Sequence, residues 1–308
     1  MQSEIQRSGQ NVAYCRDYLR QKSAALYYAT LGLSPRVRDG VSVLLAMASD
    51  ITIAIKQHGV GEADVLRQRT RVLVAHEGSP KDHALDRAYA HLVYQHRIPQ
   101  ELFLAQIEGL GWDLDKRRYH SLEALEDYAV RVGGALAMAF AIVMGRRSED
   151  VLARACDLGL AIRLTTLARD VGRHARSGRV YLPLEGREEA GVDPDLLLER
   201  PAPSPALAKV TERLLSVADG YYLRADPGIA ELPLDCRPAV RTLRYVYSAL
   251  GHELERAEYD SISHRVRVAL PRTVKLWARA LRAPRSEQRA SSGEVAPAAR
   301  PLIAAVKC

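Results

Sequence analysis

The sequence predicts an all-α protein that folds as a single helical domain. Apolar residues recur at helical spacing through most of the chain, and no alternating apolar and polar run is long enough to propose a sheet. No repeat of fixed period is visible, which argues against a helical solenoid. Of the 308 residues, 47% are hydrophobic and 26% are charged, a balance that is typical of a globular protein and excludes a wholly disordered one.

Several helix starts are marked by Ser or Pro. Ser34-Pro35 and Ser79-Pro80 each combine a capping Ser with Pro at the first helical position, and Pro99 opens another helix. Ser121 precedes two glutamates and an apolar face that keeps helical spacing through residues 122–143. We therefore expect one continuous helix there.

The later part of the chain continues in the same way. Further helices are expected at 149–175, 206–224, 237–256 and 272–282. Residues 178–183 are expected to form an extended connector, and the segment 194–205 begins and ends in Pro-rich loop. No stretch between residues 10 and 282 has the composition of a domain linker. We divide the chain into an N-terminal arm at 1–12, a helical domain at 13–282 and a flexible C-terminal tail at 283–308.

The charge balance favours anionic partners. Lys and Arg total 44 against 37 Asp and Glu, a net charge of +7. The basic residues lack the interleaved aromatic residues of a nucleic-acid surface, so we expect no nucleic-acid partner. An anionic membrane surface suits the excess better.

Cysteine usage and apolar runs indicate the compartment. The four cysteines lie far apart and match no disulfide framework or zinc module: Cys15, Cys156, Cys236 and Cys308. The N-terminus has no apolar signal core, and the longest apolar run, 133–145, is shorter than the roughly 20 residues of a spanning helix. We expect a cytoplasmic protein with reduced thiols and a peripheral position on the inner face of a membrane.

A cluster of chemistry-bearing residues lies near the end of the helix expected at 149–175. Asp170 and His174 are four residues apart and share a face, with Arg169 and Arg173 beside them. A solvated charged face is the ordinary interpretation of such a cluster. The apolar stretch 155–162 on the same helix favours burial instead, and with it a functional site.

At these residues the chain resembles the phytoene synthase and squalene synthase family of head-to-head prenyl transferases. Residues 153–183, ARACDLGLAIRLTTLARDVGRHARSGRVYLP, are similar to the family segment DLGxAxQLTNIxRDVxEDxxxGRxYLP. Shorter similarities follow the family order along the chain: SAALY at 23–27, IPQELF at 98–103, IEGLGWDL at 107–114, YAVRVGG at 128–134 and EYDSISHRVR at 258–267.

The resemblance implies a fold and a reaction. The fold is an isoprenoid-synthase-type helical bundle around a central apolar cavity, with two D-x-x-x-D motifs facing each other across its mouth. Their carboxylates hold Mg²⁺, which binds the diphosphates of two geranylgeranyl diphosphate molecules. Condensation then gives phytoene, the first carotenoid. Mg²⁺ prefers hard oxygen ligands and substrate phosphates, and carboxylates at i and i+4 share one helix face.

The first motif is lost from this sequence. Ser49 and Ile53 stand where the two ligand aspartates belong, and Ala46 stands at the family arginine. Asp50 remains, but positions 53 and 54 hold no acid, so no carboxylate pair exists in this stretch.

The second motif is altered. It keeps Asp170 but has Arg173 and His174 at the family Glu-Asp, while Arg163 and Thr166 replace a Gln and an Asn. The exchanges remove carboxylates and add positive charge, more so when His174 is protonated. Guanidinium groups bind phosphate directly and bidentately, so we hypothesise that the diphosphate is bound without a metal cluster.

The candidate residues follow from this comparison. Asp170 and the retained Asp113 are the candidate catalytic residues, and Asp170 and Asp50 the candidate Mg²⁺ ligands. The candidate diphosphate-binding residues are Ser23, Tyr27, Asp50, Arg163, Thr166, Arg169, Arg173, His174 and Tyr181. Two functions stay open: a phytoene synthase-like prenyl transferase, or a catalytically silent relative that binds an isoprenoid diphosphate or accompanies an active partner synthase.

Overall fold

The computed structural model describes residues 2–22, 27, 30–57, 61–282 and 294–307, and within these ranges the regular structure is helical with no strand. The elements in chain order are α1 (Gln2–Lys22), α3 (Pro35–Gln57), α4 (Glu62–His76), α5 (Ala84–His96), α6 (Gln100–Leu114), α7 (Leu122–Ala129), the π-helical η1 (Val130–Gly134), α8 (Ala135–Val143), α9 (Glu149–Arg169), α10 (Val171–Arg176), α11 (Leu184–Ala190), α12 (Pro194–Glu199), α13 (Pro205–Ala230), α14 (Arg237–Arg256), α15 (Leu270–Arg282), the 3₁₀-helical η2 (Pro297–Ala299) and α16 (Arg300–Lys307).

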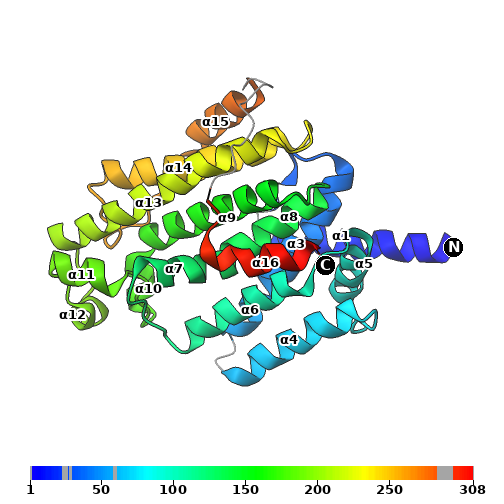
Figure 1. Ribbon diagram of the computed structural model, residues 1–308, viewed down its shortest axis with the longest axis horizontal. Coiled ribbons are helices and arrows are strands. Elements are labelled where there is room, and N and C mark those ends of the chain that lie inside the picture. Colours follow the sequence, from blue (N-terminus) through cyan, green and yellow to red (C-terminus); the bar gives the residue numbers. More distant parts are fainter. Residues whose placement is uncertain (1, 23–26, 28–29, 58–60, 283–293, 308) are drawn as a thin grey trace.

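Helix α9 forms the centre of the bundle. It packs along α13 and also contacts η1, α8 and α14 (Figure 1). Leu158, Leu160 and Ala161, which lie on different sides of α9, are all buried. A helix that is apolar all round is stable only when other helices surround it. This confirms the all-α bundle and the burial expected for this segment.

Local capping explains where several helices begin. The Ser121 hydroxyl accepts a hydrogen bond from the Ala124 amide at the start of α7, and Pro35 is the first residue of α3. Ser79-Pro80 does not open a helix as expected. The Ser79 amide donates to the Val74 carbonyl, and Gly78 has φ 80°, so this segment closes α4 in the manner of a Schellman motif. The next helix, α5, starts only at Ala84.

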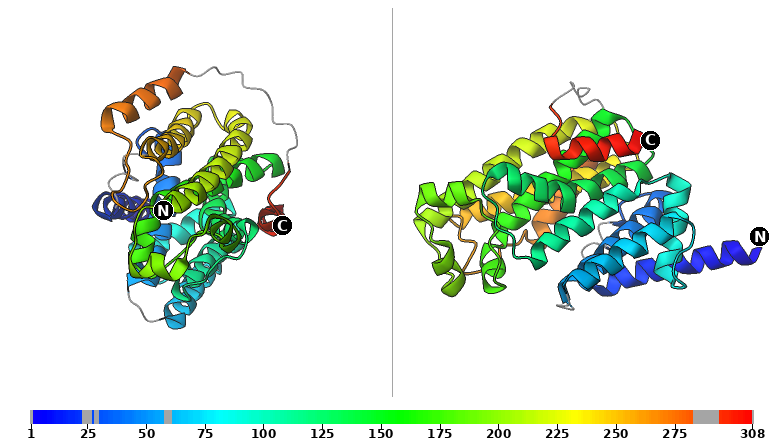
Figure 2. Two further views of the ribbon diagram at one scale, coloured as in Figure 1. Left: turned by 90° about the vertical axis from the view of Figure 1, so that its left-hand side faces the viewer. Right: turned by 60° about the horizontal axis from the view of Figure 1, so that its bottom comes forward.

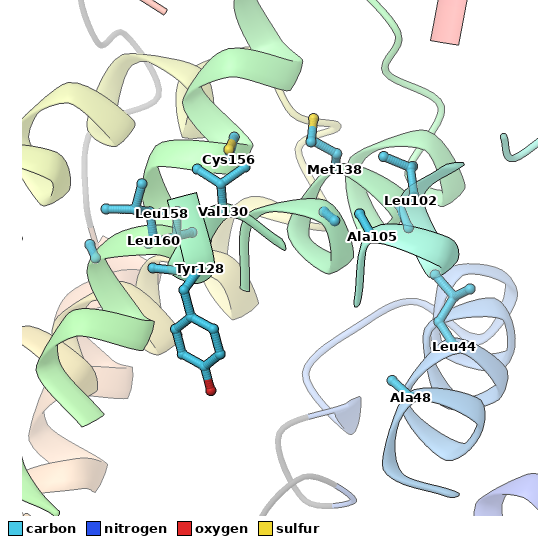
Figure 3. Packing of buried hydrophobic residues seen from close by; sticks show 14 of the residues in the cluster. Leu44, Ala48, Leu102, Ala105, Tyr128, Val130, Met138, Cys156, Leu158 and Leu160 are labelled. Atoms are coloured by element: carbon cyan, nitrogen blue, oxygen red, sulfur yellow. The ribbon is translucent and has the colours of Figure 1, made fainter. Parts of the chain in front are cut away.

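The helix expected over 122–143 is interrupted by the π-helical η1. Here the backbones of Gly133 and Gly159 touch: a Cβ on Gly159 would lie 2.4 Å from the Gly133 carbonyl oxygen. π-Turns inside α-helices are frequent at functional sites, and the contact brings α7, η1 and α8 onto α9. The helix expected over 149–175 is likewise divided, with Asp170 at the break between α9 and α10. The apolar side chains packed around η1 and α9 include Val130, Cys156 and Leu160 (Figure 3).

Both ends of the chain differ from the expected arm and tail. Residues 2–12 belong to α1, and residues 300–307 form α16, which packs against α6 and α9. Ala299, Ile303 and Val306 are buried. Their spacing places them on one face of the helical segment, and this face packs against the bundle. Figure 2 shows α16 lying along the outside of the bundle. Among the described helices, none combines the length and apolar character needed to cross a bilayer.

The glycine contact yields a stability prediction. Gly159→Ala places a methyl group 2.4 Å from the Gly133 oxygen and 2.6 Å from its carbonyl carbon. Backbone atoms cannot move aside cheaply, so we expect a loss of about 1–3 kcal/mol in the free energy of unfolding, measured by urea denaturation. Gly220→Ala, in the exposed middle of α13 with open space around it, is the matched control. It should stabilise by roughly 0.5–1 kcal/mol. Equal effects of the two substitutions would contradict the contact.

Candidate functional site

A cavity of about 380 Å³ runs between α3, η1 with α8, α9, α13 and α14. Leu45, Leu136, Phe140, Ile162 and Leu243 are among its apolar lining residues. Arg163 and Thr166, toward the C-terminal end of α9, add polar groups. Pockets of roughly 300–1,000 Å³ with apolar walls and a few polar groups are typical of small-molecule sites. The cavity therefore suits a largely apolar ligand that has one polar end.

A buried carboxylate organises the polar part of the site. The Asp113 side chain, on α6, is 1% exposed. Its Oδ1 accepts hydrogen bonds from the hydroxyls of Tyr128 at 2.9 Å and Tyr181 at 2.5 Å. The Lys56 ammonium lies 2.9 Å from Oδ2, and Arg179 Nε donates to the Asp113 backbone carbonyl at 3.0 Å.

These partners determine the protonation state of Asp113. Burial alone would raise the pKa of its carboxyl, but the Lys56 and Arg163 cations and the Tyr181 hydroxyl outweigh burial and lower the pKa below its usual value. Burial, together with the nearby arginines, lowers the pKa of Lys56, although Asp113 opposes that shift. Asp113 is thus a stable anion that accepts hydrogen bonds, rather than a proton donor.

Arg163 connects this cluster with the cavity. Its guanidinium donates a hydrogen bond to the Tyr128 hydroxyl and lies 5.0 Å from the centre of that ring and 5.9 Å from the ring of Tyr181. In Figure 3 the Tyr128 ring extends away from the apolar side chains around Val130, with its hydroxyl at the outer end. Because Arg163 also lines the cavity, it presents a positive charge to whatever occupies the apolar space.

His174 packs edge-on against Tyr181, with ring centres 4.7 Å apart. Burial and the Arg163 and Arg173 cations lower its pKa to about 3. The imidazole is therefore neutral near neutral pH, which corrects the expectation that a protonated His174 adds positive charge. Its buried Nδ1 has no hydrogen-bond partner among the described residues.

Asp170, at the α9–α10 break, is surrounded by three arginines. Arg169 donates to both carboxylate oxygens at 2.8 and 2.7 Å, Arg173 donates to Oδ2 at 2.7 Å, and Arg265 donates to Oδ1 at 2.9 Å. The carboxylate is 2% exposed. Burial opposes ionisation, but the hydrogen bonds from Arg169 and Arg265 and the Arg173 charge hold the pKa of Asp170 far below its usual range.

Asp50 belongs to a separate cluster, formed with residues of α1, α4 and α5. Its Oδ1 accepts from the Tyr18 hydroxyl at 2.8 Å and its Oδ2 from Arg71 at 2.6 Å. Arg71 also forms a two-bond ion pair with the buried Asp86, at 2.6 and 2.9 Å. This network ties α3 to α1, α4 and α5.

Comparison with known proteins agrees with this architecture. The family model described as squalene/phytoene synthase matches residues 19–273. A phytoene synthase of Rhodobacter capsulatus is 38% identical over 266 residues, which cover 85% of this chain and 78% of the relative. A phytoene synthase of Cereibacter sphaeroides is 40% identical over 261 residues, 82% of this chain and 74% of the relative. The chain belongs to the squalene/phytoene synthase family.

Solved structures show the same fold. A dehydrosqualene synthase in complex with ligand superposes with a TM-score of 0.81 at 23% identity, covering 90% of this chain and 97% of that one. A squalene synthase from Alicyclobacillus acidocaldarius superposes with a TM-score of 0.75 at 17% identity, covering 81% of this chain and 95% of that one. At these identities the likeness supports the fold alone.

The family implies Mg²⁺, and the residues of this site do not fit it. Within the described ranges, no group of three or more His, Cys, Asp or Glu side chains could hold a metal ion. Both oxygens of Asp170 are bound by guanidinium groups, and those of Asp50 by Arg71 and Tyr18. Mg²⁺ is usually held by one or two open carboxylates together with water and phosphate oxygens, and here both carboxylates already have partners, while the three arginines beside Asp170 repel a metal cation.

The remaining candidates occupy several places. Thr166 lines the cavity, and its hydroxyl donates to the Arg163 carbonyl at 2.8 Å. Tyr27 is partly buried against the core, and Ser23 lies outside the described residues. The structure thus brings Arg163, His174 and Tyr181 together with Asp113, whereas Asp50 has partners of its own. The assigned roles of all these residues stay predictions.

Four polar residues of the site were not anticipated from the sequence: Lys56, Tyr128, Arg179 and Arg265. Lys56 had a usable signal, because Ser49, Ile53 and Lys56 fall on one face at helical spacing. The face that should carry the metal-binding acids therefore ends in a cation. For Arg265 the sequence gives no such signal, because it lies 95 positions away from its partner Asp170.

The neutral His174 predicts an acid-sensitive stability. The pKa of His174 is about 3 in the folded protein and about 6.5 in the unfolded chain. As the pH falls through 6.5, the imidazole therefore becomes protonated in the unfolded chain but stays neutral in the folded protein. Between about pH 7.5 and pH 5 this imidazole should cost roughly 2 kcal/mol of unfolding free energy. In His174→Gln, the free energy of unfolding measured by urea denaturation should fall less between the two pH values than it does in the parent. His252 is exposed, so His252→Gln should show the same fall as the parent. An unchanged pH dependence in His174→Gln would contradict a buried neutral imidazole.

Proposed function

We propose that this chain binds a long-chain prenyl diphosphate, with the isoprenoid in the apolar cavity and the diphosphate against the cations at its polar end. The observation that carries the proposal is the position of Arg163, which lines the cavity and belongs to the cluster around Asp113. Geranylgeranyl diphosphate is the ligand of choice, because relatives at 38% and 40% identity are phytoene synthases.

The charge of the site supports direct binding of phosphate. Lys56, Arg163 and Arg179 surround Asp113, and Arg169, Arg173 and Arg265 surround Asp170. Six cations thus face two carboxylates, with a neutral histidine between the two groups. A diphosphate carries several negative charges and can use guanidinium donors in pairs. The cations take the place that metal ions occupy in the family pattern.

Individual side chains can then be given roles. Asp113 holds Lys56, Tyr128 and Tyr181 in place, and Tyr128 in turn orients the Arg163 guanidinium. The unpartnered Nδ1 of His174 offers one further hydrogen bond beside them. These are binding and positioning roles, and none requires a metal ion.

Condensation to phytoene is the second candidate, favoured by the 38–40% identity to phytoene synthases. The first-motif positions Ser49 and Ile53 offer no carboxylate, and Asp170 is occupied by arginines. Ionisation adds negative charge to the leaving diphosphate, and cations that are already paired with Asp113 and Asp170 stabilise that charge less than open Mg²⁺ sites would. Identity to phytoene synthases supports the phytoene synthase-like function, and the lost acids leave a silent binder, or a partner of an active synthase, as the alternative.

Calorimetric titration tests the binding proposal. We expect geranylgeranyl diphosphate to bind with equal affinity in Mg²⁺ and in EDTA, because the phosphate contacts are guanidinium groups. Arg163→Gln should weaken binding by roughly tenfold or more, the value of a charge-assisted hydrogen bond. The exposed Arg213→Gln, whose arginine pairs with Glu189 on the surface, should bind as the parent does. Binding that requires Mg²⁺ would refute the proposal.

Restoring the lost carboxylates tests the chemistry. The triple variant Ser49→Asp, Ile53→Asp and His174→Asp should show more Mg²⁺-dependent turnover of geranylgeranyl diphosphate than the parent, since it regains acids on facing helices. An inert parent beside an active variant would show that the chain is silenced by the loss of these acids. Phytoene and pyrophosphate are measured together. The variant is also made with Lys56→Gln, because Lys56 lies one turn beyond position 53 and would pair with the introduced carboxylate. Phytoene from the parent would establish the second candidate instead.

A further inference from the structure

Helix α15 carries an exposed apolar stripe. Leu270, Val274, Trp277 and Leu281 are 75%, 55%, 47% and 50% exposed. Their spacing of four, three and four residues places them on one face of the helix. Single exposed apolar residues are ordinary, but a stripe of four on one helix marks an interaction surface.

The opposite face of α15 attaches it to the protein. Ala280 is buried, Arg272 pairs with Glu253, and the Arg279 guanidinium lies 4.8 Å from the ring centre of Tyr245. Both partners belong to α14, so α15 runs antiparallel along the outside of that helix. Figures 1 and 2 show α15 as the outermost helix on this side of the bundle. The stripe therefore faces outward.

The charge of α15 indicates its partner. The helix has four basic residues, Arg272, Lys275, Arg279 and Arg282, and no acidic one. Lys275 and Arg282 are also exposed and lie about a quarter turn around the helix from Val274 and Leu281. An apolar face with Trp and Leu, bordered by Lys and Arg, is the composition of a helix that lies in the plane of a bilayer surface. A second copy of this chain would instead bring one basic helix against another.

We propose that α15 docks this protein on a bilayer that contains anionic lipids, with the stripe in the acyl-chain boundary and Lys275 and Arg282 at the headgroups. This proposal does not rest on the proposed ligand, because it concerns the free protein and a different surface.

Docking through α15 would place the cavity near the membrane. Val240, Leu243 and Tyr247 of α14 line the cavity, whereas Tyr245 and Glu253 contact α15. Helix α14, and α15 outside it, each about 10 Å across, thus lie between the apolar cavity and the bilayer surface. A ligand that partitions into lipid would have a short path between the two.

Vesicle flotation tests the proposal with the free, full-length chain. We expect binding to phosphatidylcholine vesicles that contain phosphatidylglycerol, little binding to phosphatidylcholine alone, and weakening by salt. Val274→Asp with Trp277→Asp should lower the affinity at least tenfold, and Lys275→Glu with Arg282→Glu by a similar factor, since each basic residue near an anionic surface contributes about fivefold. Leu66→Asp, at a 65% exposed apolar position on α4, is the matched control and should bind as the parent does.

Tryptophan fluorescence gives a second readout. The chain has two tryptophans, so Trp112→Phe leaves Trp277 as the reporter. Its emission should shift to shorter wavelength on anionic vesicles and be quenched by brominated acyl chains. Circular dichroism shows whether each variant is folded.

Three outcomes would overturn the proposal. They are flotation that the α15 substitutions leave unchanged, equal binding to neutral and anionic vesicles, and a dimer in light scattering that the stripe variant dissociates without any vesicle binding. The last result would assign the stripe to a second copy.

Discussion

The polar end of the cavity depends on one buried carboxylate. Asp113 is almost fully enclosed, and a buried anion is tolerated only when its partners satisfy it. Those partners come from separate parts of the chain: Lys56 from α3, Tyr128 from α7 and Tyr181 from the segment after α10. The need to pair one charge therefore joins three segments at the site. It also fixes the cations that any anionic ligand would meet.

The same principle separates this chain from the usual pattern of its family. Asp170 and Asp50 are both retained acids, yet each is neutralised by arginine rather than left open to a metal ion. A guanidinium keeps its charge at all relevant pH values and offers several donors in a plane, so it can both satisfy a buried carboxylate and contact phosphate. Arginine partners in place of metal-binding acids are therefore the chemistry on which the proposed metal-free binding of a diphosphate rests.

The sequence predicted the parts of the molecule that local chemistry determines. The capped start of α7, Pro35 at the start of α3 and the burial of α9 follow from neighbouring residues, and the loss of acids at Ser49 and Ile53 is visible without coordinates. The π-helical η1 could not be predicted in this way, because it accompanies a backbone contact between Gly133 and Gly159. Helix α16 was not predicted for a related reason. Its few apolar residues are too sparse to indicate a helix by themselves, and their burial depends on the contact with α6 and α9.

Helix α14 lies between the apolar cavity and helix α15, which carries the exposed apolar stripe. Tyr245 and Tyr247 are two residues apart, which places them roughly 200° apart around the helix axis and so on opposite sides. Tyr247 lines the cavity, while Tyr245 holds Arg279 of α15. One side of α14 is therefore committed to an apolar interior, and the other supports a basic helix with an exposed apolar stripe. Since long isoprenoids dissolve in lipid rather than in water, a cavity wall that also carries a membrane-docking helix is consistent with a protein that receives its ligand at a bilayer.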